Sequence, residues 1–265
     1  MNLWSDAVGT LHRRAGAPAR IVSLVPSLTE LICDLGLGGQ LVGRTGFCVH
    51  PRAALKSVPK VGGTKSVNLA RVRALAPTHV LLNIDENEKP TAEALAQFVP
   101  HLIVTHPLGP LDNPALYRLI GAIFGREQAA EDLCIEFDRA CAALAQAARN
   151  WPRQRVLYLI WKDPWMTVAR DTYISRTLAL AGWDSVPVGA AARYPQVELK
   201  QSLLRQAELI LLPSEPYRFR ERHLAQFRAL PDVGGKPVAL IDGEMTSWYG
   251  SRAIAGLDYL RRFRN

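Results

Sequence analysis

Apolar and small residues recur along the centre of the chain at the three- and four-residue steps of an α-helix. From Arg126 to Ala148 they form one face, while glutamate, aspartate and arginine take the other faces. Such a helix rises about 35 Å at about 1.5 Å per residue. Asn113-Pro114 can start an earlier helical stretch, with a break at Gly125 left open, and Pro152 ends the pattern. We therefore expect a long helical segment at residues 113–151.

Short apolar runs on each side of this segment have the composition of buried strands. Polar, helical stretches separate the runs, which favours parallel sheets covered by helices. The runs are Arg20–Pro26, Leu75–Asn83 and His101–Thr105 before the helix, and Arg155–Trp161, Leu204–Pro213 and Pro237–Ile241 after it. In Leu75–Asn83 and Leu204–Pro213 the end of a polar helix joins an apolar strand. The pattern predicts an α/β protein with two similar lobes, residues 19–112 and 152–265, joined by the helical segment and separated by a ligand cleft.

The basic residues give a net charge of +8 over 265 residues. They are scattered, apart from Arg261, Arg262 and Arg264, and no basic stripe alternates with aromatic residues. This distribution indicates a solvated surface and no nucleic-acid partner. Attraction for a small anionic molecule remains open.

The first residues of the chain bear on its location. Met1 to Ala19 contains Arg13 and Arg14 but no apolar stretch after them, so it does not read as a secretory signal. No apolar run is long enough for insertion into a membrane. We therefore expect a cytoplasmic, monomeric protein, with a periplasmic location as the alternative if a leader was removed.

Five segments and the long helix carry a resemblance to a known family by their combination and order. The segments are RIVSLVPSLTELICDLGLGGQLVGRTGFCVHP, KVGGTKSVNLARVRALAPTHVLLN, RVLYLIWKDPWMTVA, YPQVELKQSLLRQAELILLPSEP and GKPVALIDGEMTSWYGSRAIAGL. Together they resemble the substrate-binding proteins with a helical backbone, which serve uptake of cobalamin, siderophores and metals, and most of all the cobalamin-binding branch. The resemblance covers nearly the whole chain from Ala19. It implies two Rossmann-like lobes that move little on binding, because a helix resists hinging.

Several first-lobe residues are candidates for ligand contact. Ser27 reads as a helix N-cap with Glu30 three residues later, and free N–H groups at this turn can hold a polar ligand group. Phe47, Cys48 and His50 follow a short strand; the resemblance implies that this loop lines the cleft. Cys48 and His50 also offer a thiolate and an imidazole to a metal, although two ligands do not complete a site.

Two further first-lobe loops are candidates. Thr64 lies in a glycine-rich turn, near a position where the cobalamin-binding branch has an aromatic residue that packs on the corrin. Asn83 ends a strand and is followed by acids at 85, 86 and 88. That loop is either a solvated turn or a negatively charged rim of the cleft.

The second lobe supplies aromatic and charged candidates. Trp161 and Trp165 flank the turn after a strand, where an α/β sheet presents its binding loops, and we expect only one of the pair to touch ligand. The resemblance places an aromatic residue in the cleft at Tyr194 and a rim loop at Glu215. The last turn adds Glu244, Trp248, Tyr249 and Arg252, which suit a polar macrocycle. We expect Trp165, Tyr194 and Trp248 to face a shared opening and sandwich a flat ligand.

The expected function is non-catalytic binding of cobalamin, another corrinoid or a similar metal chelate, with no cofactor. Family members that dock on an ABC importer carry one docking glutamate on each lobe. In this chain the corresponding position of the first lobe is Ala70, and that of the second lobe is approximately Lys200, with Glu198 two residues away from it. This suggests a cytoplasmic relative that carries, senses or salvages its ligand. Two alternatives remain: direct metal binding through Cys48, His50 and either Glu244 or His106, and an enzyme acting on a corrinoid or chelate, for which no complete catalytic set is visible.

Overall fold

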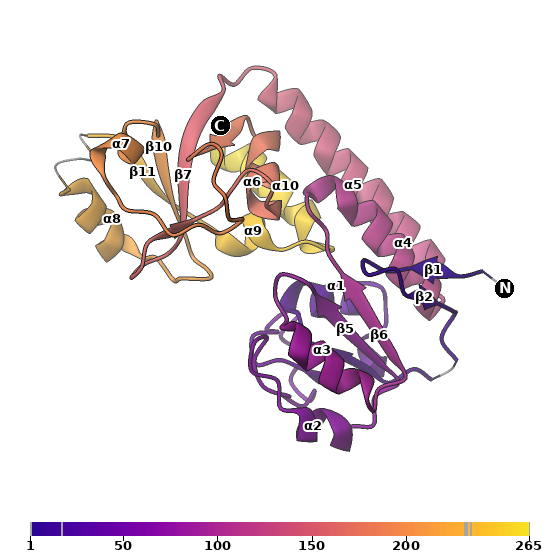
Figure 1. Ribbon diagram of the computed structural model, residues 1–265. Coiled ribbons are helices and arrows are strands. Elements are labelled where there is room, and N and C mark those ends of the chain that lie inside the picture. Colours follow the sequence, from indigo (N-terminus) through magenta and orange to yellow (C-terminus); the bar gives the residue numbers. More distant parts are fainter. Residues whose placement is uncertain (1, 17, 231–232, 234, 265) are drawn as a thin grey trace. The chain divides into compact units, whose positions relative to one another are not determined.

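In the computed structural model, which describes residues 2–16, 18–230, 233 and 235–264, mainly parallel sheets occur in both halves of the chain (Figure 1). Contacts divide the chain into two units. Unit 1 contains Met1–Pro107, Leu111–Phe137 and Tyr249–Arg252, and unit 2 contains Leu108–Pro110, Asp138–Trp248 and Ala253–Asn265. The prediction of an α/β fold with two such units is confirmed.

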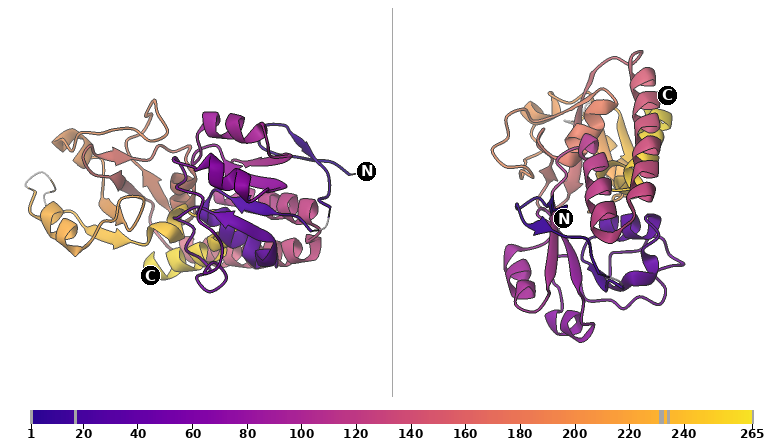
Figure 2. Two further views of the ribbon diagram at one scale, coloured as in Figure 1. Left: turned by 90° about the horizontal axis from the view of Figure 1, so that it is seen from below. Right: turned by 90° about the vertical axis from the view of Figure 1, so that its right-hand side faces the viewer.

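Unit 1 is built on a parallel sheet of four strands in the order β4-β3-β5-β6. Figure 2 shows this part of the chain, in indigo and purple, from two further sides. These strands are β3 (Ile21–Ser23), β4 (Leu41–Arg44), β5 (His79–Asn83) and β6 (His101–Thr105). The helices between them are α1 (Pro26–Asp34), the 3-10 turn η1 (Gly38–Gln40), α2 (Leu69–Ala74) and α3 (Lys89–Ala96). Val22, Val80 and Leu82 of the strands pack with Val72 and Leu95 of the helices in one buried cluster. Continuous apolar strands are expected when both faces of a parallel sheet are covered.

A hairpin near the N-terminus adds to unit 1 and was not predicted. Strands β1 (Trp4–Ser5) and β2 (Leu11–His12) pair antiparallel. The carboxylate of Asp6 accepts hydrogen bonds from the backbone N–H groups of Val8, Thr10 and Val104, the last on β6. Strands of two residues are too short to show an alternating pattern, so tertiary bonds at Asp6 rather than local sequence define this hairpin.

The central helical segment consists of two helices, α4 (Asn113–Phe124) and α5 (Glu127–Ala148), after the 3-10 turn η2 (Pro110–Asp112) (Figure 1). Gly125 ends α4 with a left-handed φ of 66°, a conformation that glycine adopts without strain. The long helix is therefore α5, which begins in unit 1 and ends in unit 2. None of the helices in the described part of the chain is long and apolar enough to span a membrane.

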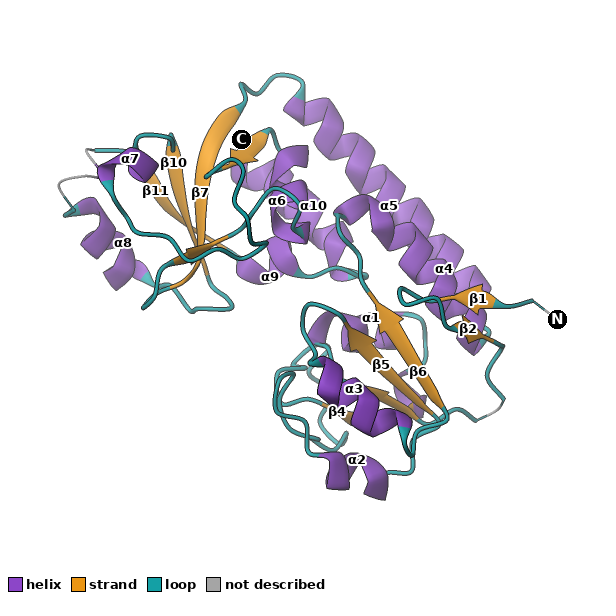
Figure 3. Cartoon of the chain, in the orientation of Figure 1, coloured by secondary structure: helices purple, strands orange, loops and turns teal. Residues whose placement is uncertain are grey.

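Unit 2 contains a five-stranded sheet in which β11, β10, β7 and β8 are neighbours in that order and β9 pairs with β7. Figure 3 labels β11, β10 and β7 of this sheet. The strands are β7 (Gln154–Trp161), β8 (Met166–Thr167), β9 (Trp183–Ser185), β10 (Leu209–Pro213) and β11 (Val238–Ile241); only β8 runs antiparallel to its neighbour. The helices are α6 (Tyr173–Leu180), α7 (Gln201–Leu204), α8 (Glu221–Arg228), α9 (Gly243–Ser247) and α10 (Arg252–Arg264).

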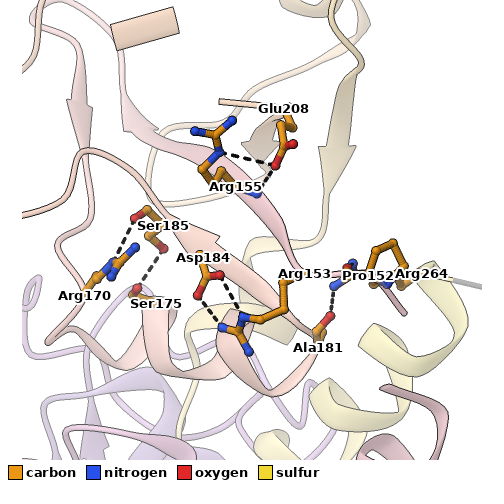
Figure 4. Close-up of polar contacts among 10 residues, drawn as sticks. All are labelled: Pro152, Arg153, Arg155, Arg170, Ser175, Ala181, Asp184, Ser185, Glu208 and Arg264. Atoms are coloured by element: carbon orange, nitrogen blue, oxygen red, sulfur yellow. Dashed lines mark hydrogen bonds and ion pairs between the residues drawn. The ribbon is translucent and has the colours of Figure 1, made fainter. Parts of the chain in front are cut away.

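Polar contacts join the elements of unit 2 at the ends of its strands (Figure 4). Arg153 donates from two nitrogens to the Asp184 carboxylate on β9, and Arg155 forms an ion pair of 3.5 Å with Glu208. The Ser175 hydroxyl on α6 donates to that of Ser185 at 2.7 Å. These contacts link β7 to β9 and to the start of β10, and α6 to β9.

Candidate functional site

The first turn of α1 places Ser27 differently from the prediction. Helix α1 begins at Pro26 with Val25 as its N-cap, and Val25 offers no side-chain cap. Ser27 is thus the second helical residue, and the predicted capping box with Glu30 is wrong because proline, with its fixed φ, starts the helix one residue earlier. Ser27 is buried, with 2% of its surface exposed. Glu30 instead accepts hydrogen bonds of 2.8 and 2.6 Å from the two guanidinium nitrogens of Arg252.

The four residues Tyr249–Arg252 belong to unit 1, although they lie far along the chain. The backbone N–H of Gly250 donates to the Asn113 side chain at 2.7 Å, and the Tyr117 hydroxyl donates to the Gly250 carbonyl at 2.9 Å. Gly250 has a φ of 76°, and an added Cβ would lie 3.2 Å from the Ser27 carbonyl oxygen. A close approach of this kind requires glycine. Arg252 is therefore held by Glu30 within unit 1, and its guanidinium is not an open anion-binding group.

Tyr249 and Glu86 form a polar pair within unit 1. The Tyr249 hydroxyl donates to Oε1 of Glu86 at 2.8 Å. Burial raises the pKa of Glu86 to about 7, while the hydrogen bond from Tyr249 and the charge of Lys65 lower it. Burial and the Glu86 charge raise the pKa of Tyr249 well above its ordinary value, against the lowering effect of hydrogen bonds with Ser27 and Thr105. Near neutral pH this carboxyl can therefore accept or donate a hydrogen bond, which is a useful property opposite amides or carboxylates.

Asn83 organises the loop that follows β5. Its side chain accepts from the Asp85 N–H at 2.8 Å, and it is 3% exposed. The Asn87 side chain accepts from the Asn83 N–H at 2.9 Å and donates to the Thr64 carbonyl at 3.0 Å. Asn83 is thus a structural residue of the loop after β5, whereas Thr64 is partly exposed. Sequence reasoning assigned no role to Asn87; an asparagine four residues after a strand end was the available signal.

Cys48 is fully buried in unit 1. Its Sγ accepts a hydrogen bond from the Thr29 hydroxyl at 3.0 Å and lies 3.1 Å from that of Thr45. Burial raises the pKa of this thiol, so it stays protonated at neutral pH. Phe47 beside it is 63% exposed, and His50 is partly exposed. In this loop a ligand can therefore reach the side chains of Phe47 and His50 but not that of Cys48.

Metal ligation has no complete donor set in the described part of the chain. No group of three or more histidine, cysteine, aspartate or glutamate side chains is placed to hold a metal ion there. Within unit 1, His106 does not complete a set of three ligands with Cys48 and His50. Metal sites in proteins normally need three or four protein ligands.

Trp161 and Trp165 have different environments in unit 2. Trp165 stacks on Phe219, with ring centroids 6.3 Å apart and planes 5° apart, and meets Phe227 edge-on at 5.1 Å. Trp161 is 41% exposed and meets the ring of Tyr217 edge-on at 5.6 Å. Trp165 thus packs against the core of unit 2, while Trp161 offers an open ring supported from one side.

The turn after β11 is joined to the turn after β10. Trp248 is 8% exposed, and its Nε1 donates to the Glu215 carboxylate. The Gly243 N–H donates to the Ser214 hydroxyl at 2.9 Å, and an added Cβ at Gly243 would lie 2.7 Å from the Glu215 backbone nitrogen. Glu215 and Trp248 are therefore hydrogen-bonded to each other within unit 2. Glu244, in the first turn of α9, is partly exposed.

Tyr194 lies in an extended segment that runs alongside β8. The N–H groups of Thr167 and Ala169 donate to the carbonyls of Pro195 and Arg193 at 3.1 and 2.8 Å. The Arg193 guanidinium lies 5.8 Å from the centroid of the Tyr194 ring, which is partly exposed. Backbone hydrogen bonds to β8 and the residues after it thus fix the segment that carries the Tyr194 ring.

Three basic side chains lie near His223, whose ring contacts that of Tyr217 edge-on. Burial is the main cause of the lowered pKa of His223, and the charges of Arg222, Lys162 and Arg220 add to it. The Tyr217 hydroxyl lies 3.4 Å from Nε2 of His223, whose Nδ1 accepts from the Arg220 N–H at 2.9 Å. Sequence reasoning missed Tyr217 and these basic side chains, for which the run Tyr217-Arg218-Phe219-Arg220 was the signal.

Comparison with known proteins decides the family. The profile described as "Periplasmic binding protein" matches residues 21–211, most of the chain. The chain belongs to the periplasmic binding protein family. A vitamin B12-binding protein of Pectobacterium carotovorum is 26% identical over 201 residues, which cover 75% of this chain and 72% of that protein.

Solved structures of periplasmic binding proteins have the same fold. The periplasmic vitamin B12 binding protein of Vibrio cholerae has a TM-score of 0.79 at 18% identity, and the apo periplasmic heme-binding protein of Roseiflexus has the same TM-score at 21% identity. Each comparison covers 93% of this chain and 97% of the other. The predicted resemblance to periplasmic-type substrate-binding proteins of the B12 branch is confirmed.

Membership of this family changes the expected location of the protein. The predicted cytoplasmic location is wrong, because the family and these relatives are periplasmic binding proteins, and the composition of residues 1–19 is a weaker indicator than membership. Proteins of this family bind small ligands and work with ABC importers. At the two positions expected to carry docking glutamates, Ala70 on α2 and Lys200 before α7 are both exposed, and Lys200 forms an ion pair with Glu198.

Proposed function

We propose that this periplasmic binding protein is a non-catalytic receptor for a metal chelate built on a flat macrocycle, with cobalamin or another corrinoid as the first ligand class. The observation that carries the proposal is the exposed ring of Trp161, supported edge-on by Tyr217 in unit 2. Aromatic faces of this kind bind flat ligands with much apolar area. The similarity to vitamin B12-binding proteins supports the corrinoid class.

Ligand contact is proposed for the open residues of the predicted set. These are Phe47, His50 and Thr64 in unit 1, with Glu86 added, and Trp161, Tyr194 and Glu244 in unit 2. The other predicted residues support the site by packing or by hydrogen bonds and do not contact the ligand in this proposal. They are Ser27, Cys48, Asn83, Trp165, Glu215, Trp248, Tyr249 and Arg252. The sandwich of Trp165, Tyr194 and Trp248 is not part of the proposal, because the first and last of these rings are packed within unit 2.

Binding without chemistry is supported by the state of Cys48, the thiol that the sequence placed in a ligand-contacting loop. Cys48 is a buried, protonated thiol that bonds to Thr29 and Thr45, and neither hydroxyl is a base. An enzyme acting on a chelate would need an activated nucleophile or a metal-bound water. The described residues offer neither arrangement.

A carboxylated tetrapyrrole such as heme is the second candidate ligand. Lys162, Arg220 and Arg222 lie near His223 in unit 2, and cations suit carboxylate substituents. Corrinoid side chains are largely neutral amides, which draw less on such charges. The fold similarity to a heme-binding protein is compatible with this candidate.

Titration of the purified full chain tests both candidates. Cyanocobalamin, cobinamide, hemin and a ferric siderophore are added separately, and absorbance and tryptophan fluorescence are followed. We expect one of them to bind with a Kd in the micromolar range or below. The Trp161→Ala protein should bind at least tenfold more weakly, while Trp4→Ala, which removes an indole from the hairpin of unit 1, should bind as the parent does. Absence of binding by all four ligands below about 1 mM, the weak end of specific recognition, refutes the proposal.

A further inference from the structure

A long stretch of unit 1 carries only positive charge. The 50 residues from Leu35 to Ile84 contain seven lysine or arginine residues and no aspartate or glutamate. Charges in such a segment cannot be neutralised by their chain neighbours. Where several of them lie close together, they raise the local concentration of anions.

Four of these cations line one pocket. The pocket has a volume of about 650 Å³ and is bordered by Arg44, Arg52, Lys56 and Lys60. Its walls are otherwise apolar or small, among them Val49, Ala53 and Leu55, and no carboxylate borders it. A concave surface with apolar walls and several charges of one sign concentrates counter-ions.

Arg44 is built into the base of this pocket. It ends β4, is only 8% exposed, and donates to the carbonyls of Thr45, Cys48 and Leu55 at 3.2, 2.9 and 3.1 Å. Within the described ranges it meets no carboxylate, and its Nε has no hydrogen-bond partner. The carbonyls orient the guanidinium without neutralising it. A buried cation with only neutral partners is costly unless an anion accompanies it.

The other three cations lie at the open side of the pocket. Arg52, Lys56 and Lys60 are exposed, and none of them pairs with a carboxylate in the part of the chain that the structure describes. The backbone holds Lys60 beside Arg44, since Arg44 N–H donates to the Pro59 carbonyl at 3.0 Å and Val61 N–H donates to the Arg44 carbonyl at 2.8 Å. Donors from a strand and from a loop therefore converge on one small volume.

We propose that this pocket binds a small polyvalent oxyanion, either a phosphate group or a polycarboxylate. The two ligand types share the chemistry that the pocket recognises, namely two or more negatively charged oxygens within a few ångströms. Charge-assisted hydrogen bonds from Arg52, Lys56 and Lys60 hold these oxygens, and Arg44 adds charge from below. The site involves unit 1 alone and does not depend on the proposed chelate function.

Calorimetric titration of the full chain with inorganic phosphate and with citrate, at constant ionic strength set by sodium chloride, tests the proposal. We expect at least one of the two to bind with a Kd below about 1 mM. The double variant Arg52→Gln/Lys56→Gln should weaken that binding at least tenfold. The control Arg13→Gln/Lys89→Gln removes the same charge from exposed positions of unit 1 outside the pocket and should change it less than twofold.

The outcomes separate the ligand types and the proposal from its failure. Binding of phosphate alone assigns a phosphate site, and binding of citrate alone assigns a polycarboxylate site. No heat of binding with either anion up to 10 mM, or an equal loss in both double variants, overturns the proposal. Chelate titration of the same variants is a separate readout, so failure of one function does not imply failure of the other.

Discussion

The hydroxyl of Tyr249 donates a 2.8 Å hydrogen bond to the carboxyl group of Glu86, across 163 positions of the chain. Glu86 belongs to the loop after β5, and Tyr249 to the four residues by which the C-terminal part of the chain rejoins unit 1. The pair joins a predicted site residue to an acid whose role the sequence left open. It also makes the stability of unit 1 dependent on protonation.

Loss of the Tyr249 hydroxyl should destabilise the protein more at high pH than at low pH. The bond to Tyr249 lowers the pKa of Glu86, so it favours the charged carboxylate. We expect Tyr249→Phe to lower the free energy of unfolding by about 1–2 kcal/mol at pH 8 and by less at pH 5. Urea unfolding at the two pH values measures this difference. Equal losses at both would show that the bond does not depend on the charge of Glu86.

The raised pKa of Glu86 predicts how stability varies with pH. Its pKa is about 7 in the folded protein and near its ordinary value of 4.5 when unfolded, so the folded state holds the proton more tightly. The contribution to stability is full below pH 4.5 and is lost as the pH rises through 7. Glu86→Gln should therefore flatten the fall in unfolding free energy between pH 5 and pH 8. Glu88→Gln, an exposed neighbour, should leave the slope unchanged.

The ion pair of Arg252 and Glu30 should show strong coupling because it is largely buried. Its side chains are 13% and 15% exposed. Burial raises the pKa of Glu30, and Arg252 only partly offsets this, so loss of one partner leaves a poorly solvated charge. A double-mutant cycle with Arg252→Gln and Glu30→Gln should give a coupling energy of about 2–3 kcal/mol. The exposed pair of Arg118 and Glu131, at 2.6 Å, is the matched control and should give a much smaller coupling energy, because solvent screens exposed charges.

The two tryptophans after β7 should separate binding from stability. Trp165→Ala removes a ring that packs on Phe219 and Phe227, and should cost about 3–5 kcal/mol of unfolding free energy. Trp161→Ala removes an exposed ring and should cost below about 1.5 kcal/mol while weakening chelate binding. Unfolding and ligand titration on both variants check this. A reversed order would exchange the roles assigned to the two rings.

Burial of Cys48 predicts that its thiol is unreactive in the folded protein. It is not exposed, and burial raises its pKa. We expect slow labelling by a thiol reagent at pH 8 that becomes fast in 6 M urea. The comparison is between the parent and Cys48→Ser. Rapid labelling of Cys48 without denaturant would reopen its role as a nucleophile or metal ligand.

The sequence by itself determined the alternation of apolar strands and polar helices, and hence the α/β fold and the long helix α5. Burial of both faces of a parallel sheet produces continuous apolar runs, and a half-buried helix repeats every 3.6 residues; both signals are local. The family resemblance could also be read from the sequence, because the segments that carry it are continuous along the chain. The hairpin at Asp6 and the start of α1 at Pro26 were not read correctly, since the first depends on a bond to β6 and the second on one proline.

Only the tertiary structure decided which candidate side chains are open. Trp161 and Trp165 are the same residue type in one turn, yet Phe219 and Phe227, more than 50 positions later, cover part of the second ring. Arg252 is satisfied by Glu30 and Trp248 by Glu215, and no local pattern relates these partners. Exposure, pairing and pKa depend on atoms that are close in space, whereas periodicity records only the neighbours along the chain.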